Sequence, residues 1–144
     1  MTTNLWVAMG LVAAGGAAGS VARLLVAVAL APHVPPVIGP FGWTPLPLAT
    51  LLVNTIGCFV IGIAGWWLVN ATEAEKEHLR LLIVTGVLGG FTTFSAFGWE
   101  TLVLAQTGRL GMAAANVAAN NILGIGACAA GWALAHAISS SPAP

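Results

Sequence analysis

The stretch Gly86-Val-Leu-Gly-Gly-Phe-Thr-Thr-Phe-Ser-Ala-Phe97 lies in the middle of a long apolar segment of the chain. Its glycines and hydroxyl residues weaken a helix, and the length of the segment places them at bilayer depth. Broken helices of membrane proteins expose backbone carbonyls that can hold a cation. We therefore expect a transmembrane helix with a break, where the backbone leaves helical geometry at Gly89–Gly90.

The composition of the whole chain agrees with a membrane protein. Of its 144 residues, 58% are hydrophobic and only 6% are charged, whereas about a quarter of a soluble domain is charged. A hydrocarbon core of ~30 Å needs about 20 apolar residues for each helical crossing, so the chain has room for four. Its continuous apolar runs lack the alternation of a transmembrane β-barrel. The predicted fold class is therefore an all-α membrane protein.

We expect one transmembrane domain over residues 1–144. Residues 31–47 hold six of the eight prolines and are expected to form a loop. The serine- and proline-rich residues 139–144 are expected to form a disordered tail. The expected helices span residues 5–30, 48–69, 77–106 and 112–138.

The few basic residues are balanced between the two sides of the membrane. With four crossings, Lys76 and Arg80 lie on the side of both termini, and Arg23 and Arg109 lie toward the other side. The positive-inside rule then gives no preferred orientation. A protein that inserts both ways and pairs antiparallel with itself is the simplest consequence, and a weakly biased single topology is the alternative.

Asparagines in apolar helices are the first candidate functional residues. Asn54 lies in the second expected helix, and an amide in the membrane usually faces a bundle interior or a polar pathway. Asn116 and Asn120 are spaced four apart in the fourth helix, so they share a face. Two interpretations remain open for this pair, namely hydrogen bonds that join helices or a polar track for a solute.

Aromatic residues are the second candidates. Phe91, Phe94 and Phe97 recur at a spacing of three and share a helix face. Such stripes usually serve packing, but the positive edge of a phenyl ring can also face an anion. The hydroxyl residues between them add neutral donors. Arg23 either snorkels to the membrane interface or attracts an anion into a vestibule.

Three strings of this sequence resemble the Fluc (CrcB) family of fluoride ion channels, over nearly the whole chain. They are Gly15-Gly16…Gly19-Ser20…Arg23, Thr50-Leu-Leu-Val-Asn54…Gly57-Cys-Phe59, and the stretch from Gly86 to Phe97 quoted above.

The resemblance implies an antiparallel, dual-topology homodimer in the bacterial inner membrane. Such a dimer has two separate pathways and passively exports fluoride from the cytoplasm, with selectivity against chloride. A structural Na⁺ at the dimer centre is implied, without an organic cofactor. The implied partners are fluoride, lipid and a second, inverted copy of the chain, and nucleic acid is not among them.

By position in the motifs, the resemblance implies roles in the fluoride pathway for five residues. Asn54 would be the pore asparagine, and Phe94 and Phe97 would line the pathways with their ring edges. Thr93 and Ser95 would be neighbouring hydroxyl donors.

Further residues carry implied roles at the centre and mouth of the channel. The backbone carbonyls of Gly89 and Thr92, from both subunits, would hold the Na⁺. Glu100 matches a carboxylate near a pore mouth, and Arg23 matches an arginine of the first helix.

This chain departs from the family pattern in two places. Ala96 stands where the family commonly has a second threonine, so one hydroxyl is missing. The family's polar track in the fourth helix often uses tyrosine and serine, but this sequence contains no tyrosine. We expect Asn116 and Asn120 to supply the donors instead.

Two other membrane functions compete with a fluoride channel. A small dual-topology multidrug exporter fits the size and charge balance, but it needs a carboxylate in the membrane, and Glu100 lies toward one end of its helix. A non-transporting assembly subunit would use the asparagines and glycines only to join helices. An enzyme is not expected, because His33, His78 and His136 are scattered and form no catalytic constellation.

Overall fold

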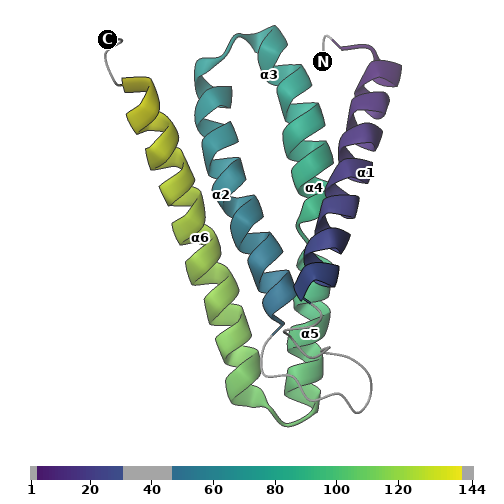
Figure 1. Ribbon diagram of the computed structural model, residues 1–144, viewed down its shortest axis with the longest axis vertical. Coiled ribbons are helices and arrows are strands. Elements are labelled where there is room, and N and C mark those ends of the chain that lie inside the picture. The colour runs from purple at the N-terminus through teal and green to yellow at the C-terminus, as the bar shows by residue number, and fades with distance from the viewer. Residues whose placement is uncertain (1–2, 31–46, 141–144) are drawn as a thin grey trace.

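The computed structural model describes residues 3–30 and 47–140, and its regular elements there are all helical (Figure 1). Four helical stretches are long and apolar enough to cross a membrane, at Leu5–Leu30, Leu48–Asn70, Lys76–Gln106 and Leu110–Ser140. The predicted all-α class with four membrane-spanning helices is confirmed for the described residues. The elements are α1 (Leu5–Leu30), α2 (Leu48–Asn70), α3 (Glu73–Leu79), η1 (Arg80–Leu88), α4 (Gly89–Phe91), α5 (Phe94–Gln106) and α6 (Leu110–Ser140).

Most helix boundaries lie close to those expected. α1 has the expected ends, while the third stretch begins at Glu73 rather than at residue 77. α6 continues to Ser140, two residues into the segment expected as a tail. It starts directly after a turn in which Gly108 has a φ of +77°, a conformation that favours glycine. Residues 141–144 and nearly all of the expected loop lie outside the described residues.

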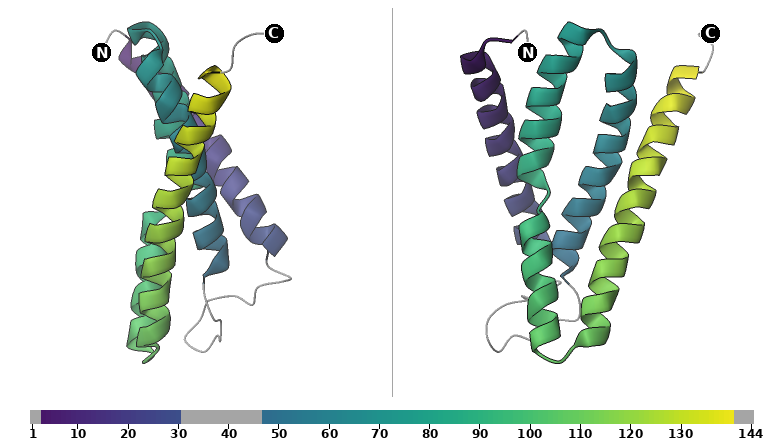
Figure 2. Two further views of the ribbon diagram at one scale, coloured as in Figure 1. Left: turned by 90° about the vertical axis from the view of Figure 1, so that its left-hand side faces the viewer. Right: turned by 180° about the vertical axis from the view of Figure 1, so that it is seen from behind.

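The helices run up and down in a fan (Figure 1). α1 begins, and α6 ends, at the end of the molecule that holds α3, while the turn between α5 and α6 lies at the opposite end. α2 packs along α6, and α1 packs along η1 and α4. The side view in Figure 2 shows α1 inclined to α5 and α6. This path brings the first half of α2, which carries Asn54, beside the junction of α4 and α5.

Glycines make the contact between α1 and the third membrane segment. A Cβ atom on Gly15 would strike the carbonyl oxygen of Leu82, and one on Gly19 would strike that of Val87. From the other side, a Cβ on Gly90 would strike the carbonyl of Gly16. Small residues allow such close backbone approach in lipid, where van der Waals packing drives helix association. The glycine motif of α1 is thus a packing surface.

α2 and α6 use the same device. Gly62 faces the backbone carbonyl of Cys128, and Gly131 faces that of Phe59, in each case without room for a side chain. Cys58 and Cys128 are free thiols within this helix pair, partly buried. A free cysteine in such a position packs as a small apolar residue.

The third membrane segment differs from the expectation. Gly89, with φ −62° and ψ −37°, is helical, and Gly90 lies with it in α4. The prediction that the backbone leaves helical geometry at Gly89–Gly90 is therefore wrong. Extended backbone occurs instead at Thr92 (ψ 159°) and Thr93 (φ −149°, ψ 103°), between α4 and α5. The physical reason is that Gly90 packs against α1 as part of a helix, while Thr93 bonds to α2.

The residues before α4 contain a second feature that the sequence pattern did not predict. η1 is a π-helix of nine residues, far longer than the single-turn bulges in which this geometry usually occurs. It carries Gly86, whose Cα atom lies against Gly15 of α1.

Two glycines of α1 provide a matched test of this packing. We expect Gly19→Ala to destabilise the protein by about 1–3 kcal/mol, because its Cβ would overlap with the backbone of Val87. Gly16→Ala is the control, since its Cβ meets nothing within 4 Å. Thermal unfolding in detergent measures both variants. Equal melting temperatures would contradict the glycine contact.

Candidate functional site

Asn54 is the side chain around which the site forms. The backbone N–H of Thr93 donates to Asn54 Oδ1 at 2.9 Å, across 39 positions of sequence. In a continuous α-helix the same N–H would bond to the carbonyl of Gly89, four residues earlier. The amide of Asn54 thus replaces a helix bond, and this replacement accounts for the extended backbone between α4 and α5.

Thr93 starts the next helix as its N-cap. Its hydroxyl accepts a hydrogen bond from the N–H of Ala96 at 3.2 Å, which is the pattern of a threonine cap. The hydroxyl also lies 3.3 Å from Ser95 Oγ. α5 therefore begins at Phe94, because α4 ends at Phe91 with Thr92 as its C-cap and Thr93 caps the following helix.

Two backbone carbonyls lose their usual helix partners at this junction. The N–H that would serve Gly89 goes to Asn54, and the N–H of Ala96 that would serve Thr92 goes to the hydroxyl of Thr93. Carbonyl oxygens freed in this way are ligands for a hard cation such as Na⁺. Among the described residues, no cluster of three or more His, Cys, Asp or Glu side chains could hold a metal. The donor chemistry at the junction therefore fits a cation held by backbone.

The asparagines of α6 are joined to Asn54 by hydrogen bonds. Asn54 Nδ2 donates to Asn120 Oδ1 at 3.2 Å, and Asn120 Nδ2 donates to the backbone oxygen and Oδ1 of Asn116 at 3.0 and 3.1 Å. Asn116 Nδ2 then donates to Thr101 Oγ1 at 2.9 Å. Interhelical hydrogen bonding, one of the two interpretations left open by the sequence, thus applies to these residues. Thr101 was not a candidate, because a lone threonine in an apolar helix carries no distinctive signal.

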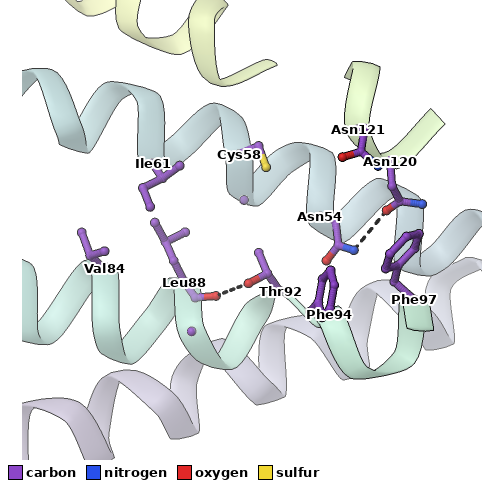
Figure 3. A pocket seen from close by; sticks show the side chains of 12 residues that line it. Asn54, Cys58, Ile61, Val84, Leu88, Thr92, Phe94, Phe97, Asn120 and Asn121 are labelled. Atoms are coloured by element: carbon purple, nitrogen blue, oxygen red, sulfur yellow. Dashed lines mark hydrogen bonds between the residues drawn. The ribbon is translucent and has the colours of Figure 1, made fainter. Parts of the chain in front are cut away.

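A cavity of about 370 Å³ opens beside these side chains (Figure 3). Its wall includes Asn54 and Asn120, together with the rings of Phe94 and Phe97, whose centroids lie 5.4 Å apart at 50°. Phe94 is 83% exposed, so its ring has little of the chain around it. The complete lining is Asn54, Gly57, Cys58, Ile61, Val84, Leu88, Gly89, Thr92, Phe94, Phe97, Asn120 and Asn121.

Several candidates lie outside this lining. Thr93 and Asn116 are buried behind it, Ser95 is exposed elsewhere on α5, and Arg23 is half-buried on α1. Glu100 also lies outside the lining and accepts a hydrogen bond from Thr50 Oγ1 at 2.7 Å.

The Glu100–Thr50 pair is itself partly buried. Thr50 is 7% exposed and sits on α2, four residues before Asn54. The second carboxyl oxygen of Glu100, Oε2, is buried without a hydrogen-bond partner among the described residues. Thr50 and Asn54 belong to one of the strings that resemble the family, but that string did not indicate the hydrogen bond to Glu100 on α5.

Comparison with known proteins places these features in a family. Residues 10–132 match the family described as "CrcB-like protein, Camphor Resistance (CrcB)". The chain belongs to this CrcB-like family. The CrcB-like chain is 43% identical over 128 residues to the "Fluoride-specific ion channel FluC" of Caulobacter vibrioides, covering 89% of this chain and 94% of that one.

Other relatives of this CrcB-like protein carry the same name. The FluC of Rhodospirillum centenum is 42% identical over 123 residues, which cover 85% of this chain and 90% of the relative. That of Allorhizobium ampelinum is 44% identical over 123 residues, covering 85% and 91%. These relatives are named as ion channels rather than as enzymes.

Loss of the Asn54 amide tests the bond that separates α4 from α5 in this CrcB-like protein. In Asn54→Leu the N–H of Thr93 loses its acceptor, which costs about 1–3 kcal/mol if the group stays buried. We expect faster hydrogen exchange at the Thr93 amide. Asn70→Leu is the control, since Asn70 is exposed and donates to the backbone oxygen of Trp66 in its own helix. Unchanged exchange in Asn54→Leu would speak against this bond.

Proposed function

We propose that this CrcB-like protein is a fluoride-selective passive channel that exports fluoride from the cytoplasm and lowers fluoride toxicity. The observation that carries the proposal is a cavity walled by neutral amides and phenyl rings, from Asn54 and Asn120 to Phe94 and Phe97. The names of its relatives point to the same ion. The protein is a multi-pass protein of the bacterial inner membrane.

The chemistry of the wall suits fluoride. This ion is small and strongly hydrated, so a pathway must replace its lost water with donors without binding it so tightly that it cannot leave. The N–H groups of an amide and the positive edge of a phenyl ring are weak, neutral partners for an anion. Among the described residues, no lysine or arginine lines the cavity, so none of them holds the ion there with a full positive charge.

The two competing functions have less support. A proton-coupled exporter needs a carboxylate at its substrate site, but Glu100 bonds to Thr50 and does not line the cavity. The other three acidic residues of the chain fall within residues 73–77. A purely structural role as an assembly subunit does not explain a cavity lined by amides and phenyl rings. Passive conduction of an anion remains the function that the geometry supports best.

The working unit in this proposal is an antiparallel, dual-topology homodimer. One chain leaves the ring of Phe94 83% exposed beside the cavity, and a second copy would cover it. The basic residues support the inverted arrangement, because Lys76 and Arg80 lie near one end of the molecule and Arg23 and Arg109 lie toward the other. An equal number of basic residues at each end gives no bias to either insertion. Each copy would then contribute to two pathways.

A structural Na⁺ at the centre of this dimer belongs to the same proposal. The carbonyls of Gly89 and Thr92, freed from their helix bonds, are the residues that would hold it, two from each copy. The ion would neutralise the partial negative charge of these oxygens where the two chains meet. Thr93, buried behind the cavity, and Ser95, exposed on α5, would be neighbouring hydroxyl donors, and Arg23 and Glu100 would act near the mouths of the pathway.

Fluoride efflux from proteoliposomes tests the function directly. We expect vesicles that contain the purified protein to release fluoride on addition of a potassium ionophore, while chloride stays inside. A fluoride-selective electrode and a chloride electrode measure the two ions. Vesicles that retain fluoride, or that release both ions equally, would refute the proposed channel.

Replacement of the Phe94 and Phe97 rings tests whether they contribute to the fluoride pathway. We expect Phe94→Ile and Phe97→Ile each to lower fluoride efflux by roughly tenfold or more, which corresponds to a rise of about 1.4 kcal/mol in the barrier, because the positive edge of the ring no longer faces the ion. Both variants should still form dimers in detergent. Phe59→Ile is the control, because Phe59 lies on α2 and is not among the residues that line the cavity. Full efflux in both pathway variants would exclude the role of the ring edges.

A further inference from the structure

The hydrogen bonds that join α2, α6 and α5 run in one direction. The backbone N–H of Thr93 can only donate, so the Asn54 atom that faces it at 2.9 Å must be the carbonyl oxygen. The amide nitrogen of Asn54 therefore points to Asn120, which receives it with Oδ1 at 3.2 Å. Asn120 in turn has only its nitrogen left for its other neighbour. The orientation of each amide thus determines that of the next.

At its other end, this series of hydrogen bonds stops at a backbone carbonyl, that of Phe97. Asn120 Nδ2 donates to Asn116 Oδ1, Asn116 Nδ2 donates to Thr101 Oγ1, and the Thr101 hydroxyl donates to the backbone oxygen of Phe97 at 2.7 Å. A backbone carbonyl can only accept. The two ends therefore impose the same direction. Both ends lie on the segment that carries the two pathway phenylalanines.

The members of the series do not all reach the cavity. Asn54 and Asn120 line it (Figure 3), whereas Asn116 and Thr101 do not. Asn116 is 1% exposed, and its nitrogen and its oxygen are both engaged within the protein. It has no free face to offer an ion. Its position behind Asn120 suits a residue that orients another one.

We propose that Asn116 and Thr101 are positioning residues, which hold the amide of Asn120 and, through it, the N–H groups of Asn54 in one orientation. The inference rests on the proposed function as a fluoride channel. It separates two asparagines that the sequence pattern treats alike, because Asn120 meets the pathway and Asn116 does not.

The weakest bonds of the series are those at the cavity. Asn54 Nδ2 reaches the oxygens of Asn120 and Thr93 at 3.2 and 3.4 Å, near or beyond the long end of the usual range. Because these hydrogen bonds are long, the N–H groups of Asn54 can donate to an anion instead with little loss of bonding free energy. If Asn120 were free to rotate, its own N–H groups would face those of Asn54. The positioning pair prevents this reversal, so the N–H groups of Asn54 face an oxygen of Asn120 whose long hydrogen bond an anion can replace.

Substitutions at Thr101 test the far end of the series. Thr101→Val removes the hydroxyl and keeps the shape, and we expect it to lower fluoride efflux roughly two- to tenfold, as loss of one hydrogen bond would. Thr101→Ser keeps the hydroxyl and should restore efflux. Thr107→Val is the matched control, because that hydroxyl also donates to a carbonyl four residues back, of Val103, but is exposed and bonds within α5. Efflux unchanged in Thr101→Val would overturn the proposal.

A double-mutant cycle tests whether Asn116 acts through Asn120. Efflux is measured for Asn116→Ala, Asn120→Ala and the double variant, with dimer formation and melting temperature checked for each. We expect the double variant to conduct no less than Asn120→Ala alone. Reductions that multiply would mean that Asn116 meets the ion independently, and they would refute its positioning role.

The outcomes separate this inference from the proposed function. A wild-type protein that conducts no fluoride refutes the channel itself. A conducting wild type with unaffected Thr101→Val, or with independent effects at the two asparagines, refutes only the positioning pair. If Asn116→Ala fails to fold, the comparison of Thr101→Val with Thr101→Ser decides.

Discussion

The hydrogen bond from the Thr93 N–H to Asn54 Oδ1 is the interaction on which the site depends. It takes a donor away from the third membrane segment, and three consequences follow from that single exchange. The backbone of Thr92 and Thr93 becomes extended, the carbonyl of Gly89 loses its helix partner, and α5 restarts with Phe94 at its first position. In a membrane such an exchange is stable because the side chain of one helix satisfies the group that another helix leaves open.

Two kinds of contact hold the frame around this bond. Glycines bring α1 against η1 and α4, and other glycines bring α2 against α6, at backbone-to-backbone distance. Asparagines and threonines then connect the two halves through Asn54, Asn120 and Thr101. The glycine contacts depend on close packing of backbones, and the amide contacts depend on the orientation of each hydrogen-bond donor and acceptor. The cavity lies beside the hydrogen bond between Asn54 and Asn120. Its wall therefore contains neutral amide donors as well as the aromatic rings of α5.

The sequence predicted the parts of this structure that local composition determines. Continuous apolar runs located the four membrane helices to within a few residues, and the spacing of Asn116 and Asn120 placed both on one face. It did not locate the extended backbone, because the glycines suggested residues 89–90 while the deciding partner, Asn54, lies 39 residues away in sequence. The π-helix η1 and the hydrogen bonds of Thr101 also depend on neighbouring helices. They therefore cannot be predicted from the sequence of one apolar segment alone.

The exposed ring of Phe94 has a consequence for how two chains would meet. In water, a phenyl ring left 83% uncovered would drive association by the hydrophobic effect, but lipid tails are as apolar as the ring itself. Its exposure therefore supplies almost no net attraction within a bilayer. Pairing must depend on shape, on polar groups and on how well the helices match the thickness of the surrounding lipid. The balance between single and paired chains would then respond to acyl-chain length far more than to salt.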